Sequence, residues 1–365
     1  MIDSCVGAKE FERMLNPKEI VLAKKHTEKV YSAIQTVFQP DKDPHLIVVD
    51  NPISQTTTNY SHILGLADAY GSLERGTEPL IFIKKQISIR EQDPEFKKVL
   101  KEFIFKHSIN GFFTTYCLES SGKGTKKYIT KEILGRGGNI LGLKTLRDEQ
   151  DLEILVNAWD IDNPEEIRQL TREHQAKLNQ AKTVKAVTGN GKYVLTVDIN
   201  DFSGDSNTAE FDIESTKKSM GSLGKSKYGN MIWGEAYLQG MGASSRTNGE
   251  FEVLLFRGKD GAEYAKHPLI FRFEQGYLTH VSGDNQNLKS FLAERQINET
   301  IYTLKKDEVI FSEQLPELII DEIAMPTNPH ARIIPHTMVA EKAGVHFALG
   351  NPHRDQIGQG YLAFE

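Results

Sequence analysis

Two histidines and three carboxylates in the second half of the chain are residue types that bind catalytic metal ions. Glu235 and Glu322 each lie within an apolar, strand-like stretch, and His346 lies in another. His353 and Asp355 follow a few residues later, near the end of the sequence. Imidazole nitrogens and carboxylate oxygens without a thiolate are typical of catalytic metal centres that keep room for water. If these five residues converge, the chain is a metalloenzyme or the remnant of one.

The turn between the two histidines decides whether they can share a site. Side chains repeat every two residues along a strand, so His353 and Asp355 lie on one face. If Asn351-Pro352 is a two-residue turn, Ala348 pairs with Asp355 and His346 lies on that same face. A three-residue turn would place His346 on the opposite face.

Simpler interpretations of the same residues stay open. His346 could be a core histidine, with His353 and Asp355 in a solvated tail. Glu235 and Glu322, each taken alone, fit edge-strand carboxylates, although burial would require a partner for each. Glu341, shortly before the His346 strand, is a candidate ligand or general base, or a surface residue.

The elements that position these residues follow from hydrophobic patterning. The first half alternates strand and helix signals, which is typical of a parallel sheet with helices on its faces. Strands are predicted at 45–50, 80–83, 111–116 and 139–143, and helices at 61–70, from Asp93 onward and at 128–134. We therefore expect an α/β first domain with a mainly parallel sheet over residues 1–160.

The second half has a different character. A helix beginning near Asn163 is predicted to connect two domains over residues 161–182. Residues 183–365 are rich in alternating strand patterns, including a hairpin at Gln275-Gly276, and predict a strand-rich α+β domain that carries the metal site. Residues 201–230, rich in Ser, Gly, Asn and Lys, are predicted to form a long surface loop.

Bulk composition excludes several classes of function. The net charge of −6 and the lack of a basic stripe argue against nucleic-acid binding. The two cysteines of the 365-residue chain cannot form a disulfide framework or a thiolate zinc site. The sequence shows no signal peptide and no apolar run of roughly 20 residues, so we expect a cytoplasmic protein without a membrane partner.

The order of the motifs resembles the thermophilic aminopeptidase (aminopeptidase T) family of metallopeptidases and its relatives, the 2,5-dihydroxypyridine dioxygenases. Gly234-Glu235 is similar to the family's Gly-Glu turn, and 321–329 to its second glutamate with a Thr-Asn loop. Residues 345–350 resemble its His-aliphatic-Ala-Leu-Gly strand, and 353–358 its closing His-x-Asp strand. The chain departs from the family between these strands, because only 350–352 intervene and the family's tyrosine is absent.

The resemblance implies three functions. The first is an aminopeptidase-like hydrolase that acts on a peptide N-terminus, with two zinc, cobalt or manganese ions that share a carboxylate and activate water. In it, Glu235, Glu322, His346, His353 and Asp355 are ligands and Glu341 a ligand or base. The second is an iron-dependent ring-cleaving dioxygenase on a small molecule, with His346, His353 and Asp355 as a facial triad. The third is a non-catalytic peptide-binding protein of a biosynthetic pathway. A homodimer is also implied.

Overall fold

The computed structural model divides the chain into two compact units, the first comprising Met1–Pro164 and Ala209–Ile232 and the second Glu165–Thr208 and Trp233–Glu365. The residues that it describes are 5–38, 45–50, 58–84, 111–114, 139–142, 146, 148–159, 164–200, 202, 204–207, 227–230, 234–239, 246–258, 261–333, 340, 342–350, 355–358 and 360–364. The helices predicted from Asp93 and at 128–134 lie outside these residues. No helix within the described ranges is both long and apolar enough to cross a membrane.

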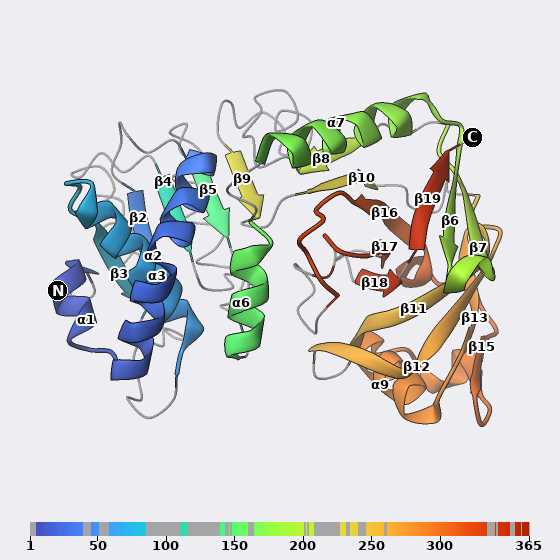
Figure 1. The fold of residues 1–365 in the computed structure, drawn as a ribbon. Helices are drawn as coiled ribbons and strands as arrows, with labels where there is room; N and C mark the ends of the chain where they lie inside the picture. Colours follow the sequence, from blue (N-terminus) through green and yellow to red (C-terminus); the bar gives the residue numbers. More distant parts are fainter. Residues whose placement is uncertain are drawn as a thin grey trace, which may run out of the picture. The chain divides into compact units, whose positions relative to one another are not determined.

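The first unit is built on a six-stranded sheet in the order β1-β3-β2-β4-β5-β9 (Figure 1). Its neighbours pair in parallel, apart from β1 and β3, which are antiparallel. Its elements are β1 (Cys5–Val6), α1 (Ala8–Glu12), α2 (Pro17–Phe38), β2 (His45–Asp50), α3 (Tyr60–Glu74), β3 (Leu80–Lys84), β4 (Gly111–Thr114), β5 (Asn139–Gly142), α6 (Glu149–Asn157) and β9 (Lys227–Asn230).

Two glycines allow helix α3 to pack closely. A Cβ at Gly65 would lie 2.4 Å from Val49 of β2, and a Cβ at Gly71 would lie 2.4 Å from Tyr31 of α2. Real Cβ atoms do not approach other atoms so closely, so both positions need glycine for the helix to touch its neighbours. The spacing of these two glycines in the sequence thus fixes α3 between a strand and a helix.

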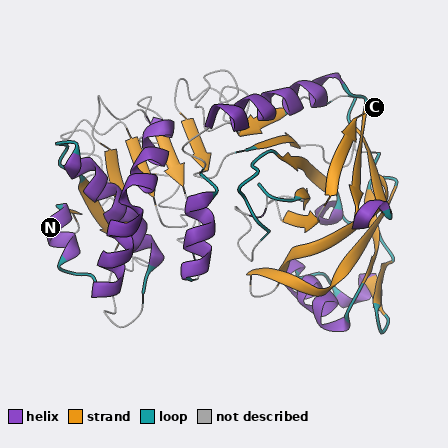
Figure 2. Ribbon diagram, in the orientation of Figure 1, coloured by secondary structure: helices purple, strands orange, loops and turns teal. Residues whose placement is uncertain are grey.

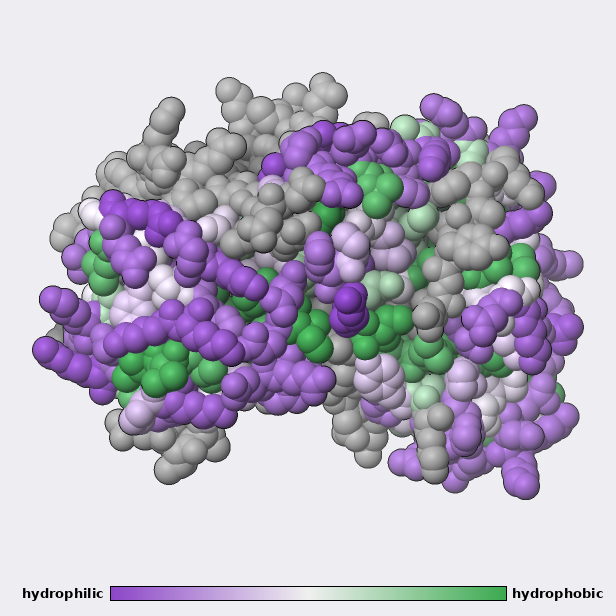
Figure 3. All heavy atoms as spheres, in the orientation of Figure 1, coloured by the Kyte–Doolittle hydropathy of each residue, from purple (hydrophilic) through white to green (hydrophobic). Residues whose placement is uncertain are grey.

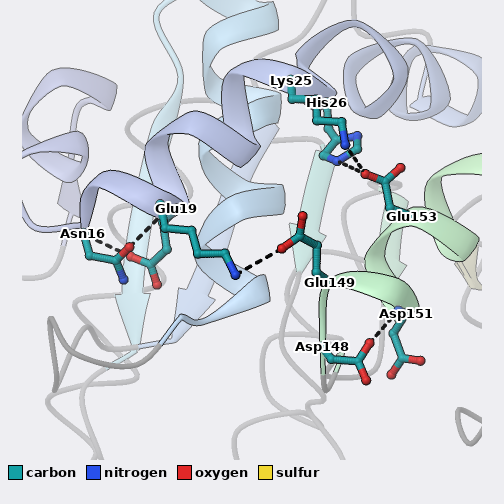
Figure 4. A network of polar contacts seen from close by, with 9 residues as sticks. Asn16, Glu19, Lys25, His26, Asp148, Glu149, Asp151 and Glu153 are labelled. Carbon is teal, nitrogen blue, oxygen red and sulfur yellow. Dashed lines mark hydrogen bonds and ion pairs between the residues drawn. The ribbon is translucent and has the colours of Figure 1, made fainter.

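Polar contacts tie α2 to α6 within the first unit (Figure 4). Asn16 and Glu19 form a reciprocal capping box at the start of α2, with bonds of 3.0 and 3.1 Å. Farther along α2, Lys25 and His26 both contact Glu153 of α6. Burial lowers the pKa of His26, against the raising effect of Glu153. The α2–α6 contact therefore holds a histidine that is preferentially neutral.

The second unit is a large antiparallel sheet with helices, which confirms the strand-rich prediction (Figure 2). Its main path runs β14-β15-β13-β12-β11-β18-β17-β16-β10-β8, while β7 pairs with β11 and β6, and β6 with β19. The elements are α7 (Pro164–Gln180), β6 (Thr183–Thr188), η3 (Gly189–Gly191), β7 (Tyr193–Asp198), β8 (Asp205–Asn207), β10 (Glu235–Gln239), β11 (Asn248–Gly258), β12 (Gly261–Glu274), β13 (Tyr277–Ser282), α9 (Asn285–Arg295), η5 (Glu299–Ile301), β14 (Tyr302–Leu304), β15 (Glu308–Phe311), η6 (Pro316–Leu318), β16 (Ile320–Pro326), β17 (Val345–Leu349), β18 (Asp355–Gly358) and β19 (Gly360–Phe364).

Several local predictions can be compared with this unit directly. The hairpin at Gln275-Gly276 joins β12 to β13, and both turn residues have positive φ, as a tight two-residue turn requires. The predicted connector is the amphipathic helix α7, which buries Ile167, Thr171 and Leu178. In Figure 3 its outward side is covered mainly by hydrophilic residues. The stretch predicted as a long loop contains β8 and β9, and β9 belongs to the first unit's sheet.

An aromatic core fixes the central strand β17. Phe347 packs edge-to-face against Phe251, Phe271 and Phe273, with ring centroids 4.9, 5.8 and 5.4 Å apart. All five residues of β17 are buried. Because side chains alternate along a strand, the residues on either side of Phe347 point to the opposite face. His346 is one of them.

Candidate metal centre

Three neighbouring strands place Glu235, Glu322 and His346 on one face of the sheet. In β16 and β17, Ala324 pairs with His346 and Glu322 pairs with Ala348. In β10 and β16, Glu235 pairs with Pro326. Directly paired residues share a face, and so do residues two apart on a strand. The register alone therefore directs the two carboxylates and the imidazole to the same side.

Small residues leave room for these side chains to meet. Between β16 and β17, His346 lies opposite Ala324 and Glu322 lies opposite Ala348, and both alanines are buried. On their other sides His346 pairs with Ile357 and Glu322 with Gln239. Alanine offers only a methyl group at positions where a longer side chain would fill the space above the sheet. Glu322 and His346 can therefore approach one another across two alanine methyl groups.

The three side chains do converge. One ligand atom of each of Glu235, Glu322 and His346 lies within 4.8 Å of the others. His346 Nε2 lies 3.0 Å from Glu235 Oε1 and 3.5 Å from Glu322 Oε1. Metal–ligand bonds of about 2.1 Å place neighbouring ligand atoms roughly 3 to 3.5 Å apart. The donor types and their spacing thus fit one divalent cation.

A backbone carbonyl orients the imidazole. His346 Nδ1 lies 3.3 Å from the carbonyl oxygen of Gly344. Since a carbonyl can only accept, Nδ1 carries the proton and donates it, which directs Nε2 toward the two carboxylates. Metal-binding histidines commonly donate their second ring nitrogen in this way. The same arrangement is also compatible with a cluster that holds no metal, in which a protonated Nε2 donates to the carboxylates.

The turn before β10 positions Glu235. Gly234 has φ of +101°, and a Cβ there would lie 2.6 Å from Asn328 Cβ. The carbonyl of Gly234 accepts from the backbone N–H of Thr327 at 2.9 Å. The Thr327 hydroxyl in turn lies 2.5 Å from that of Thr171 on α7, and both residues are buried. The Gly-Glu turn is thereby fixed against the loop that follows β16.

A lysine that the sequence did not indicate completes this cluster. Lys342 lies in the turn before β17, only 1% exposed, and its Nζ donates to Glu235 Oε2. Glu235 itself is 5% exposed. In the sequence, the position of Lys342 four residues before His346 is the signal that could indicate a role in the site. Lysines in turns are usually solvated, however.

The structure therefore brings together three of the six predicted site residues. Glu341 and His353 lie outside the described residues. For Asp355 the backbone is described, and Ala348 pairs with Asp355 while His346 pairs with Ile357. This register is the one expected from a two-residue turn at Asn351-Pro352. Whether any of the six binds a metal stays a prediction.

Comparisons with known proteins bear on the fold. No protein-family model matches the chain, and no curated protein matches it in sequence. Among solved structures, the chain is similar to 2,5-dihydroxypyridine dioxygenase from Pseudomonas putida KT2440, with a TM-score of 0.56 and 10% identity over 93% of this chain and 91% of that chain. At that identity the likeness shows a shared fold. The neighbour carries the name of one of the two families in the predicted resemblance, and the comparisons give the aminopeptidase side no support.

Proposed function

We propose that this chain binds one divalent metal ion, ferrous iron, and is an oxygenase that cleaves a hydroxylated aromatic or pyridine-type ring. The observation that carries the proposal is the convergence of Glu235, Glu322 and His346 within 4.8 Å. The fold shared with 2,5-dihydroxypyridine dioxygenase supports the choice of chemistry. A ferrous ion in such a site would supply the redox chemistry by which dioxygen opens an aromatic ring. Both oxygen atoms enter the product, so no external reductant is consumed.

The chain's own residues have definable roles in this proposal. His346 would hold the metal through Nε2, and Gly344 would keep that ring in place. Glu235 and Glu322 would contribute carboxylate oxygens. We propose His353 and Asp355 as further ligands, because Asp355 pairs with Ala348, two residues along β17 from His346. The proposed ligands would then comprise two histidines and three carboxylates, a set that includes the two histidines and one carboxylate of non-haem iron oxygenases.

The test is anaerobic loading with ferrous iron, followed by metal analysis and oxygen uptake. We expect about one iron per chain and one oxygen consumed per ring opened when 2,5-dihydroxypyridine is supplied. Glu322→Gln and His346→Ala should lose the iron. Asp321→Asn, which changes the neighbouring carboxylate of β16 on the other face, should keep it.

Other outcomes would redirect the assignment. Two equivalents of zinc, cobalt or manganese with chelator-sensitive release of N-terminal amino acids would replace the oxygenase by the aminopeptidase-like hydrolase. Tight peptide binding without metal or turnover would instead identify a binding protein. Iron retained by both Glu322→Gln and His346→Ala would show that the ion lies elsewhere.

A further inference from the structure

A buried lysine stands among the candidate metal ligands. The Lys342 side chain is almost fully buried, and its ammonium donates to Glu235 Oε2. The other oxygen of the same carboxylate, Oε1, lies 3.0 Å from His346 Nε2. A single carboxylate thus faces a cation on one side and the proposed metal ligand on the other.

Such burial has a physical cost that needs a reason. An ammonium removed from water is unfavourable unless a close counter-charge compensates it. Glu235 provides that charge, and the backbone around Lys342 is fixed by a helical turn in which Gly344 N–H donates to the Ala340 carbonyl at 2.9 Å. A lysine that faces the solvent would avoid this desolvation cost. The fold instead directs Lys342 toward Glu235 in the proposed metal site.

We propose that Lys342 is a built-in cation that holds one oxygen of Glu235 and so limits the centre to a single metal ion. The inference rests on the proposed metal site. In a two-metal centre a carboxylate between the ions gives one oxygen to each. Here the ammonium lies at the Oε2 side of Glu235, which leaves Oε1, next to His346 Nε2, for the one metal. Lys342 is therefore a positioning residue, because it acts through Glu235.

The charges of the described side chains agree with this. Glu235 and Glu322 carry two negative charges, and Lys342 returns one positive charge to the site. One divalent ion then brings the sum of these groups to +1, whereas two would bring it to +3. If the proposed ligand Asp355 is counted as well, the sums are 0 with one ion and +2 with two. In a buried site of low dielectric, excess charge of that size is strongly unfavourable.

The test is metal binding by the full chain, measured with manganese and zinc by calorimetry and by elemental analysis after gel filtration. Wild type should bind about one equivalent. Lys342→Met, which keeps the length and removes the charge, should bind a second equivalent or bind the first on the order of tenfold more tightly. Lys342→Arg should behave as wild type, and Lys305→Met, at an exposed lysine, is the matched control.

A double-mutant cycle isolates the proposed route. If Lys342 acts through Glu235, the Lys342→Met effect on metal affinity should vanish in a Glu235→Gln background. That double variant also removes the unpaired buried charge. If Lys342→Met alone does not fold, the double variant is compared with Glu235→Gln, and a difference in metal affinity between those two would overturn the inference. An effect of equal size in both backgrounds would overturn the inference.

The results separate this inference from the proposed function. Wild type with two equivalents, or Lys342→Met with unchanged stoichiometry and affinity, would overturn the role of Lys342 while leaving a metalloenzyme. Metal bound by Lys342→Met and not by wild type would show that Lys342 excludes the metal altogether, which would overturn both the single-ion role of Lys342 and the oxygenase. Failure of both proteins to bind any metal would overturn both.

Discussion

At the scale of single residues, Gly234 offers the sharpest test of how Glu235 is positioned. Its φ of +101° is rarely adopted by residues with a side chain, and a Cβ would also meet Asn328. We expect Gly234→Ala to cost about 1–3 kcal/mol from backbone strain, plus a clash that shifts Glu235. Gly191→Ala is the control, because Gly191 has a φ of +90° with nothing within 4 Å.

The two alanine variants should therefore differ in kind. Both should lower the free energy of unfolding in denaturant titrations, but Gly234→Ala alone should weaken metal binding. Equal metal affinity in the two variants would mean that the Gly-Glu turn does not set the position of the ligand.

Part of this site could be predicted from residue types and strand patterns. Glu235, Glu322 and His346 were expected together because each interrupts an apolar run, and the register brings them to one face. Lys342 was not expected, because a lysine beside Ala and Gly in a turn looks solvated. Only the tertiary placement of that turn over β10 shows the Glu235 contact. The spacing to His346 places Lys342 near the site, but the identity of its partner is non-local and cannot be taken from spacing.

At the scale of elements, the contact between α2 and α6 predicts a pH dependence of stability. Burial lowers the pKa of His26 below its usual value near 6.5, with Glu153 opposing and Lys25 and Lys29 adding to the lowering. The unfolded chain therefore binds the proton more readily than the folded one. Stability is present above the usual histidine pKa and is lost as pH falls through the lowered value.

The expected size follows from the same linkage. Between about pH 7.5 and about pH 5.5, His26 can account for at most about 1.4 kcal/mol of lost unfolding free energy. His26→Gln should flatten that dependence in urea unfolding followed by circular dichroism. Glu153→Gln should steepen it, because it removes the group that raises the pKa of His26. Identical slopes in all three proteins would contradict the assignment.

Elements differ in how visible they are in the sequence. The strands β2, β3 and β5 coincide with their predicted apolar runs, and α7 with its capping signal, because local pattern alone defines them. The sequence predicts a loop where β9 lies, since Lys-Tyr-Gly-Asn has no apolar run. Strand β9 pairs with β5 across a long stretch of chain, and such pairing is decided by tertiary structure.

At the scale of the whole molecule, the division into two units predicts where a metal should stabilise the chain. All three converging candidate ligands belong to the second unit, on β10, β16 and β17. A ligand that binds only the folded state stabilises it by about 2.7 kcal/mol at one hundred times its dissociation constant. That free energy applies to the unit that must unfold to release the ion.

Hydrogen exchange measured with and without metal reports the stabilisation of each unit separately. On adding manganese or ferrous iron, we expect slower exchange in peptides that cover β10, β16 and β17, and unchanged exchange in α2 and α3 of the first unit. His346→Ala should abolish the difference. Slower exchange spread equally over both units would mean that they unfold together, so that the metal stabilises the chain as one cooperative body. Slowing confined to the first unit would place the ion outside the cluster of Glu235, Glu322 and His346.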